Sequence, residues 1–484
     1  MEKNITKKEW RTMLLEELRT RAMQIGHVTK EYEPMIEEIN KEAQVAIFAW
    51  KHKDNEELGI FVELKVDDGS LINFSKYTNS EESSLKYSEV QLSEMALEFV
   101  KGQHPDALKS FTLEEWKKTG EKKYRLSYVQ TELNLPLPFS GFNIDIAVNG
   151  EITSYRYYGN AENVQMPDSI VDKETVMKEY LTELDIELLI SELSSDIYVE
   201  GDNLPHLVYE PSLPFRFYPA NGDKKTLEYD EEDKIEERLE KITKPKETDV
   251  SLNELIGFNE NNFQKVREQD MGDVTGVVWR LKNDNEYDEN GLTIEDYFKR
   301  RNDHTLKIIR NNETGNIHGI MSFLERKGEK SLTYQECKVI ALQFLFCLHP
   351  TAEQFFRLVV NKSSQEANND LYHYEFRLFY NKIPIRFGTV RISVKRTTGI
   401  IDHYMGPNIL IEALSKVTAN PAVSSSEARE IFCGEFDIEL QWRQEYLDNK
   451  ESYFTLAYAP CYPRLSGDLS FIDAQTGKKI IKKL

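Results

Sequence analysis

Apolar residues follow two kinds of spacing along this chain, and the two kinds alternate. Between Leu92 and Phe99 they recur at i, i+3, i+4 and i+7, the spacing of a helix that buries one face. At Ile144 and Ile146 they alternate with polar residues, as in a half-buried strand. The pattern predicts units made of one helix followed by a strand, a turn and a second strand.

The same helix pattern recurs in the second half of the chain. The segment LEFVKGQHP at residues 97–105 matches LQFLFCLHP at residues 342–350. Each segment follows an S/T-x-x-E/Q capping box, in which two side chains satisfy free N–H groups at a helix start. The two boxes are Ser88 with Gln91, and Thr333 with Glu336. We therefore predict one capped helix at the same place in each half.

Further matches follow in the same order. They are LPL at 135–137 with IPI at 383–385, DIEL at 185–188 with DIEL at 437–440, and LVYEP at 207–211 with LAYAP at 456–460. One short match can arise by chance, but several in one order indicate an internal duplication.

Glycine turns support the same interpretation, with three in each half. Glycine readily adopts the positive φ that tight hairpins require, and Asn or Asp before it tolerates that conformation. The predicted turn glycines are Gly69, Gly150, Gly222, Gly315, Gly399 and Gly477.

The duplication predicts two domains, residues 1–245 and residues 246–484, each with three helix–hairpin units. A chain of 484 residues suits two domains of this size. The boundary is placed at Pro245, which ends a charged segment predicted to begin as a helix through Ile235, Leu239 and Ile242. The polar segment 282–301 is predicted to be a mobile insertion, and the segment 362–370 a loop.

The predicted fold class is α+β. An isolated hairpin is marginal in water, so the hairpins are expected to join edge to edge and to carry the helices on one face. The result is two tandem copies of a domain with antiparallel sheets covered by helices on one face.

Two long segments carry a resemblance to a known family. LPLPFSGFNIDIAVNGEITSY at 135–155 and IPIRFGTVRISVKRTTGIIDHY at 383–404 resemble the YcdB/YcdC repeat family of Gram-positive bacteria and, more distantly, PepSY and peptidase-propeptide domains. The resemblance covers roughly residues 87–219 and 332–484. It supplies no catalytic residues, and through PepSY-like domains it implies modulation of peptidases, often outside the membrane.

The charge of the chain restricts its partners. Asp and Glu number 83 against 61 Lys and Arg, a formal net charge of −22. Such a field repels nucleic-acid phosphates and anionic lipids. The segment from Met1 to Trp10 lacks the apolar run of a signal peptide, and no apolar stretch of membrane-spanning length occurs. We therefore expect no nucleic acid, no membrane span and a cytoplasmic protein, which departs from the envelope role of PepSY-like domains.

Histidines give no metal motif, since neither H-E-x-x-H nor H-x-H occurs. His104 and His349 each precede a proline at a helix end, where a cationic or hydrogen-bonding side chain suits the helix C-terminus. For His349, His373 and His403, the sequence gives no argument that they meet. No metal and no cofactor are predicted.

Catalytic motifs are also missing from the sequence. It has no G-x-S-x-G, no S-x-x-K set and no phosphate-binding glycine loop. Cys337, Cys347, Cys433 and Cys461 are expected to be reduced thiols, with Cys433 inert. The acidic run 229–233 is expected to be a solvated linker.

Two groups of residues occur in both halves and need an interpretation. The carboxylate pairs Asp185 with Glu187, and Asp437 with Glu439, are expected to cap a helix or form ion pairs rather than to act as acid and base. Strand aromatics such as Tyr155, Tyr158, Tyr374 and Phe376 are expected to fill the core rather than to form a binding patch.

The sequence thus favours a non-catalytic interaction protein, such as a peptidase modulator or a peptide binder, with an unknown protein or peptide partner. Two alternatives stay open. One is a hydrolase whose residues meet only in three dimensions, and the other is a structural protein of a spore or envelope layer.

Overall fold

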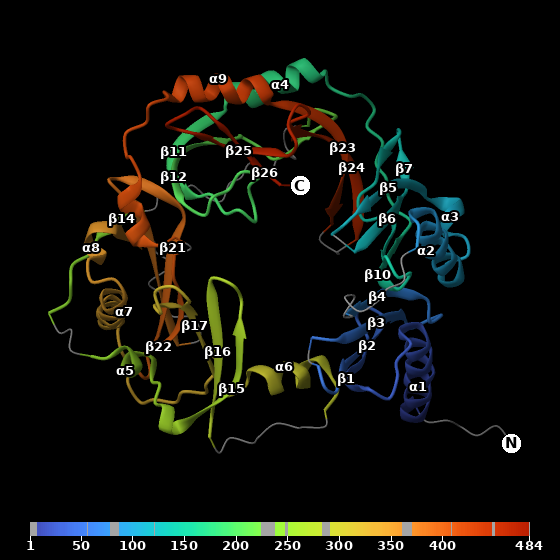
Figure 1. Cartoon of the computed structure of the whole chain (residues 1–484), viewed down its shortest axis with the longest axis horizontal. Coiled ribbons are helices and arrows are strands. Elements are labelled where there is room, and N and C mark those ends of the chain that lie inside the picture. Colours follow the sequence, from blue (N-terminus) through green and yellow to red (C-terminus); the bar gives the residue numbers. More distant parts are fainter. Residues whose placement is uncertain are drawn as a thin grey trace.

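The elements of the chain are arranged in a ring, as Figure 1 shows for the computed structural model. Most helices lie on the outside of this ring and the sheets lie on its inside (Figure 1). The structure describes residues 7–55, 57–77, 87–120, 122–223, 238–246, 250–282, 291–360, 370–407, 409–447 and 451–483. None of the described helices is both long and apolar enough to cross a lipid bilayer.

The first part of the ring is an eight-stranded antiparallel sheet with helices on one face. Its elements are α1 (Lys7–Gly26), β1 (Tyr32–Asn40), β2 (Val45–His52), β3 (Gly59–Lys65), β4 (Leu71–Tyr77), α2 (Glu89–Gln103), α3 (Ala107–Ser110), β5 (Thr112–Lys118), β6 (Lys123–Val129), β9 (Gly141–Ala147) and β10 (Ile152–Gly159). The strand order is β1-β2-β3-β4-β10-β9-β6-β5. Leu92 and Ala96 of α2 are fully buried with Ile144 and Ile146 of the sheet, as the apolar spacing predicted.

The second part repeats this arrangement. Its elements are α5 (Leu252–Ile256), β15 (Phe263–Asp270), β16 (Val274–Leu281), β17 (Thr305–Asn311), β18 (Ile317–Ser322), α7 (Tyr334–Leu348), α8 (Ala352–Phe355), β19 (Phe356–Val360), β20 (Leu371–Tyr380), β21 (Ile383–Lys395) and β22 (Ile400–Met405). The strands pair in the order β15-β16-β17-β18-β22-β21-β20-β19, which is the order of the first sheet. The predicted α+β duplication is confirmed.

All six predicted turn glycines have positive φ, between 66° and 83°. Five of them join strands that pair as hairpins. Gly222 instead follows the short strand β13 (Tyr218–Pro219). A side chain would strain the backbone at these positions, so glycine fixes where each hairpin turns.

The third unit of each copy is built from strands of both copies. Its elements are α4 (Lys173–Thr182), β11 (Asp185–Glu192) and β12 (Pro205–Ser212) in the first copy, and α9 (Ser425–Glu435), β23 (Asp437–Tyr446), β24 (Ser452–Cys461), β25 (Asp468–Asp473) and β26 (Lys479–Lys482) in the second. β13 of the first copy pairs with β24, and β25 of the second copy pairs with β12. Helix α9 packs on β11 and β12, while α4 packs on β23. The two copies have therefore exchanged parts.

Equivalent hydrogen bonds cross between the copies in both directions. The Tyr209 hydroxyl donates to the carbonyl of Val423 at 2.8 Å, and the equivalent Tyr458 hydroxyl donates to the carbonyl of Val171 at 2.8 Å. Val423 and Val171 each precede the residue that caps α9 or α4. Reciprocal contacts of this kind are the signature of a two-fold axis, so the exchange is pseudo-symmetric.

Three sequence-based predictions about local structure are wrong in the described residues. Leu239, predicted on a helix, lies on β14 (Arg238–Lys241), which pairs with the edge of β19. The DIEL segments, whose carboxylates were expected to cap a helix or form ion pairs, form strands β11 and β23, following the two-residue alternation of their apolar side chains. The predicted mobile insertion ends in helix α6 (Ile294–Asn302), with a capping box of Thr293 and Asp296.

Other predicted segments lie partly or wholly outside the described residues. They are the start of the predicted linker helix with Ile235 and the acidic run 229–233, most of the predicted loop 362–370, and the start of the predicted insertion at 283–290. The domain boundary at Pro245 stays a prediction.

The described strands pair in antiparallel fashion apart from single pairings such as Ile190 with Ile385, where β11 joins β21 in parallel.

The two predicted capping boxes are present at α2 and α7, with both hydrogen bonds of each box formed. His104 and His349 are the C-terminal capping residues of these helices, through their backbone N–H groups. Their imidazoles do not cap the helices. The ring of His104 donates from Nε2 to the carbonyl of Leu71 at 2.8 Å, and Nε2 of His349 is buried without a hydrogen-bond partner among the described residues. Burial lowers the pKa of His349 to about 4, against a weaker opposing effect of Glu412.

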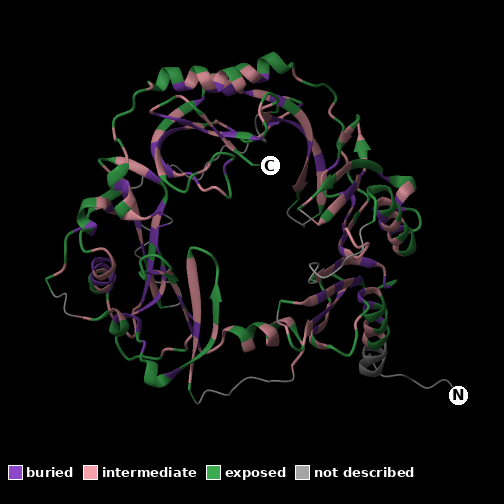
Figure 2. Cartoon of the chain, viewed as in Figure 1, coloured by how far each residue is buried: buried purple, intermediate pink, exposed green. Residues whose placement is uncertain are grey.

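Buried residues gather where the helices meet the sheets, and the outer faces of α4 and α9 are largely exposed (Figure 2). The sheet faces turned away from the helices face the middle of the ring (Figure 1). This arrangement leaves the helix-free face of each sheet as the surface on which side chains are not committed to the core.

The exchange of strands predicts that the two copies associate even when the chain is cut between them. We expect residues 1–245 and 246–484, co-expressed as two chains with a tag on one, to co-purify as a one-to-one complex. Size-exclusion chromatography with mass determination checks this. Recovery of the tagged fragment alone, folded and monomeric, would contradict the exchange.

The neutral state of His349 predicts an acid-dependent loss of stability. Because its pKa falls from 6.5 to about 4 on folding, the unfolded chain binds more protons between these values. The contribution of His349 to the free energy of unfolding is therefore fully present above about pH 6.5 and falls by about 3 kcal/mol as the pH approaches 4. Measured by urea unfolding, the free energy of unfolding of His349→Gln should decrease less over this pH range than that of the wild type. Parallel curves for the two proteins would refute the assignment.

Candidate functional site

A pocket of about 930 Å³ lies where the ring closes, between the first sheet and helix α6. α6 belongs to the second copy but packs against β1 of the first. The backbone N–H of Glu37 donates to the carbonyl of Leu292 at 2.7 Å, and the N–H of Ile294 donates to the carboxylate of Glu38 at 2.9 Å. We call this the ring-closing pocket. Its lining residues are Glu33, Pro34, Met35, Ile36, Ala49, Trp50, Lys51, Glu57, Leu58, Gly59, Ile60, Phe61, Tyr77, Leu292, Tyr297, Arg300 and Arg301.

The floor of the pocket is the helix-free face of the first sheet. One cross-strand row runs through Ala49 and Phe61, and the next runs through Lys51, Gly59 and Tyr77. Ala49 and Gly59 have small or no side chains, so the floor is hollow between the larger side chains of Phe61, Lys51 and Tyr77 in the same rows. The side chains of Trp50 and Ile60 point to the opposite face and are buried in the core.

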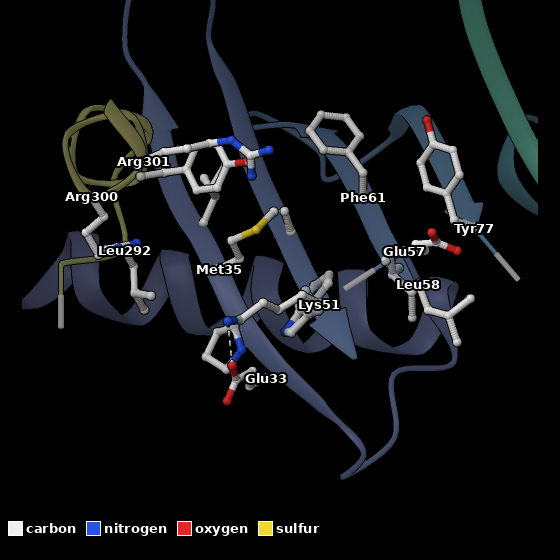
Figure 3. A pocket seen from close by; sticks show the side chains of 17 residues that line it. Glu33, Met35, Lys51, Glu57, Leu58, Phe61, Tyr77, Leu292, Arg300 and Arg301 are labelled. Atoms are coloured by element: carbon white, nitrogen blue, oxygen red, sulfur yellow. Dashed lines mark hydrogen bonds and ion pairs between the residues drawn. The ribbon is translucent and has the colours of Figure 1, made fainter. Parts of the chain in front are cut away.

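A bulge in β1 places a further apolar side chain beside this floor. The register shifts between Pro34 and Ile36, so Met35 has no partner residue on β2. Bulges of this kind redirect a side chain and interrupt strand pairing. Met35 therefore lies in the pocket with Phe61, as Figure 3 shows.

Helix α6 supplies the remaining wall through residues at helical spacing. Tyr297, Arg300 and Arg301 lie three and four positions apart and so share one face of the helix. The Arg301 Nη1 donates to the hydroxyl of Tyr297 at 3.2 Å. The Arg300 guanidinium donates to the carbonyl of Gly291, which holds it at the start of the α6 segment.

The charges in the pocket are unevenly paired. Lys51 forms an ion pair with Glu33 at 2.9 Å (Figure 3), and this contact lowers the pKa of Glu33. Arg301 has no carboxylate partner among the described residues, and Glu57 has no cationic partner among them. The lining residues include no Ser, Thr, Cys or His. The pocket thus has an apolar floor with charged rims, the composition of a binding site.

Two of the three histidines considered from the sequence are brought onto β20 and β22, the two strands that flank β21. His373 and His403 lie on either side of Ser393 in one cross-strand row, and His373 Nδ1 lies 2.8 Å from Ser393 Oγ. Burial, followed by the charge of His403, lowers the pKa of His373. His349 lies at the end of α7, which covers the other face of this sheet. In the described part of the chain, no group of three or more His, Cys, Asp or Glu could hold a metal ion.

The duplicated carboxylates are not brought together as acid and base. Asp437 forms an ion pair with Lys173 at 2.8 Å, as expected for an ion-pairing role, although it begins a strand rather than a helix. Glu187 faces Glu210 across β11 and β12.

All four cysteines are free thiols, and burial raises the pKa of Cys337 and of Cys461 to about 11. Raised values of this size keep a thiol protonated and unreactive.

The strand aromatics are mostly core residues. Tyr155, Tyr374 and Phe376 are fully buried, whereas Tyr158 is partly exposed. Two exposed aromatics were missed by the sequence reasoning. Phe139 and Phe387 occupy equivalent places in the two copies, are 65% and 62% exposed, and have φ of 53° and 56°. The matching segments LPLPF and IPIRF could have pointed to them.

That backbone conformation is unfavourable for a bulky side chain and costs on the order of 1 kcal/mol. Each ring has an aromatic or cationic neighbour, because Phe139 contacts Tyr158 edge-on and the Arg386 guanidinium lies over Phe387. Core packing does not explain why both copies keep an exposed ring at this position.

Comparisons with known proteins agree with the repeated architecture. The family described as "YcdB, YcdC repeated domain" matches residues 15–159 and 247–408, the first two units of each copy. YcdB of Bacillus subtilis (strain 168) is 37% identical over 473 residues, covering 96% of this chain and 97% of that protein. YcdC of the same organism is 34% identical over 471 residues, covering 96% of this chain and 99% of that protein.

Among solved structures, the C-terminal domain of YpeB from Bacillus megaterium is 10% identical and covers 63% of this chain and 95% of that chain. Its TM-score of 0.26 is too low to support an argument about fold or function. The family match covers more than half of the chain in two copies, and the two Bacillus subtilis relatives match it almost from end to end. This chain is a member of the YcdB/YcdC repeat family.

Proposed function

We propose that this protein is a non-catalytic binding protein that holds a peptide segment of a partner protein in the ring-closing pocket. The observation that carries the proposal is the pocket itself, with Met35 and Phe61 in its floor and Arg301 on its rim. Its volume of about 930 Å³ is at the upper end of the range for ligand sites. An apolar floor gives affinity, and charged groups around it give orientation.

The position of the pocket adds support. It is formed by β1–β3 of the first copy and α6 of the second, so a ligand there contacts both copies at once. Sites between two structural units are common places for ligands. The resemblance to PepSY-like domains makes a peptidase one partner to test. A structural role in a spore or envelope layer stays an alternative that fractionation of cells would examine.

A hydrolase is the second candidate, and one observation favours it. The Ser393 hydroxyl and the His373 imidazole are in hydrogen-bond contact at 2.8 Å, the arrangement of a nucleophile and its base. Ser393 is only 7% exposed, however, and its other cross-strand neighbour is His403 rather than a carboxylate that would orient the base.

The binding proposal predicts that peptides selected on this protein depend on Phe61. Peptides enriched from a phage-displayed library should bind the wild type and lose about tenfold or more in affinity on Phe61→Ser, because burial of a Phe side chain contributes about 1.5–3 kcal/mol. Leu113→Ser is the matched control, since Leu113 is an exposed apolar residue on β5 at the other edge of the same sheet. Equal binding to all three proteins, measured by isothermal titration, would overturn the proposed site.

The hydrolase candidate predicts a different result. On a panel of ester, peptide and phosphoester substrates, we expect the wild type and Ser393→Ala to give the same background rates. Turnover by the wild type that disappears in Ser393→Ala would instead establish catalysis and replace the binding proposal.

A further inference from the structure

We infer that the peptide bound in the ring-closing pocket carries an acidic group at the α6 end, an apolar side chain in the middle and a basic group at the β3–β4 end. This inference rests on the proposed function and adds the chemistry and orientation of the ligand. It follows from the order of charged and apolar side chains across the pocket, from α6 to β4.

The α6 end of the pocket is cationic. Arg301 projects from the last turn of α6 toward the floor, whereas the neighbouring Arg300 guanidinium donates to the carbonyl of Gly291 at the edge of the pocket (Figure 3). Arg301 is exposed, and its one described hydrogen bond is to the Tyr297 hydroxyl. A guanidinium has five N–H donors, so Arg301 keeps donors for a carboxylate. In a chain with a net charge of −22, a cationic rim of this kind singles out an anionic group on a ligand.

The middle of the pocket is apolar and hollow. Phe61 and Met35 flank the small residues Ala49 and Gly59. Lys51 is the cation on this floor, and it is already paired with Glu33 at 2.9 Å. An aromatic or aliphatic side chain suits the hollow, because it buries apolar area without breaking that ion pair.

The far end of the pocket is anionic and aromatic. Glu57 lies two residues before β3, and Tyr77 ends β4, so both lie on the side of the sheet away from α6 (Figure 3). Glu57 is exposed and has no cationic partner in the described residues, and Tyr77 is exposed beside Gly59 in the strand register. A carboxylate next to an open aromatic ring recognises an ammonium or guanidinium group.

The width of the floor sets the length of the ligand. Neighbouring strands lie about 4.8 Å apart, so β1 and β3 are separated by roughly 10 Å. An extended peptide of five residues spans about 13 Å between its first and last Cα atoms, enough to cross the floor from β1 to β3, and its terminal side chains extend beyond these strands toward the two rims. A suitable probe is Lys-Gly-Phe-Gly-Asp, capped at both ends so that only its side chains are charged.

The test combines substitutions in the full-length protein with substitutions in the probe. Arg301→Gln should weaken binding of the probe about five- to tenfold, and should have less than about a twofold effect when the Asp of the probe is replaced by Asn. Glu57→Gln should weaken binding of the same probe by a similar factor, and should lose its effect when the Lys of the probe is replaced by Gln.

Matched controls separate these contacts from the general charge of the protein. Lys299→Gln removes a cation from the same turn of α6, but Lys299 pairs with Glu295 at 2.6 Å and does not line the pocket. Glu42→Gln removes an exposed carboxylate at the opposite end of the β1–β2 hairpin. Neither control should change the affinity of the probe by more than about twofold, because exposed charges outside the contact are screened.

The outcomes distinguish this inference from the proposed function. Binding of the probe that depends on Phe61, with no coupling between Arg301 and its acid or between Glu57 and its base, would overturn the inferred orientation and leave the binding site in place. Coupling of Arg301 to the base of the probe would also overturn it. Absence of binding at millimolar probe, or binding that Phe61→Ser leaves unchanged, would overturn both.

Discussion

The exchange of strands between the two third units is the constraint on which the other features of the ring depend. β13 completes a sheet with β23 and β24 of the second copy, and β25 and β26 complete a sheet with β11 and β12 of the first. The bonds from Tyr209 to Val423 and from Tyr458 to Val171 fix each third-unit helix to the other copy. Because the exchange is reciprocal, neither copy can shift without disturbing both sheets.

The ring-closing pocket is a consequence of that constraint at the opposite side of the ring. Because the third units fix the position of the two copies relative to each other, α6 of the second copy packs against the edge strand β1 of the first. The pocket then needs few special residues, because the hollow comes from Ala49 and Gly59 and its apolar floor from Met35 and Phe61. Its charges come from both copies, so the site exists only in the closed ring. A ligand that contacts both rims would stabilise this closure by mass action.

The two copies have kept their core faces and changed their helix-free faces. Ile144 and Ile392 are both fully buried under the helices. One position along, Asp145 accepts two hydrogen bonds from Arg125 at 2.7 and 2.8 Å, whereas the equivalent Ser393 contacts His373. Side chains on the helix-free face contribute little to the core, so this face can diverge without loss of the fold. It is therefore the face on which a function particular to each copy is expected to be found.

The sequence by itself determined the local elements and their repetition. The capping boxes at Ser88 and Thr333, the six turn glycines and the alternation around Ile144 each follow from short-range physics, namely unsatisfied N–H groups, positive φ and the two-residue period of a strand. The same local logic misassigned Leu239 and the DIEL segments. Strand β14, which contains Leu239, is stabilised by β19, a partner far away in the chain that no local pattern contains. The DIEL strands pair with the next strand along the chain, and their two-residue alternation was overlooked.

Only the tertiary structure decided which copy completes which sheet and where a pocket forms. Met35, Phe61, Glu57 and Arg301 lie on separate elements of both copies, and none belongs to a motif with recognisable spacing. Their proximity depends on the register of β1–β4 and on the docking of α6, both of which are set by long-range pairing. Apolar periodicity specifies which face of an element is buried, but it does not specify the element against which that face packs.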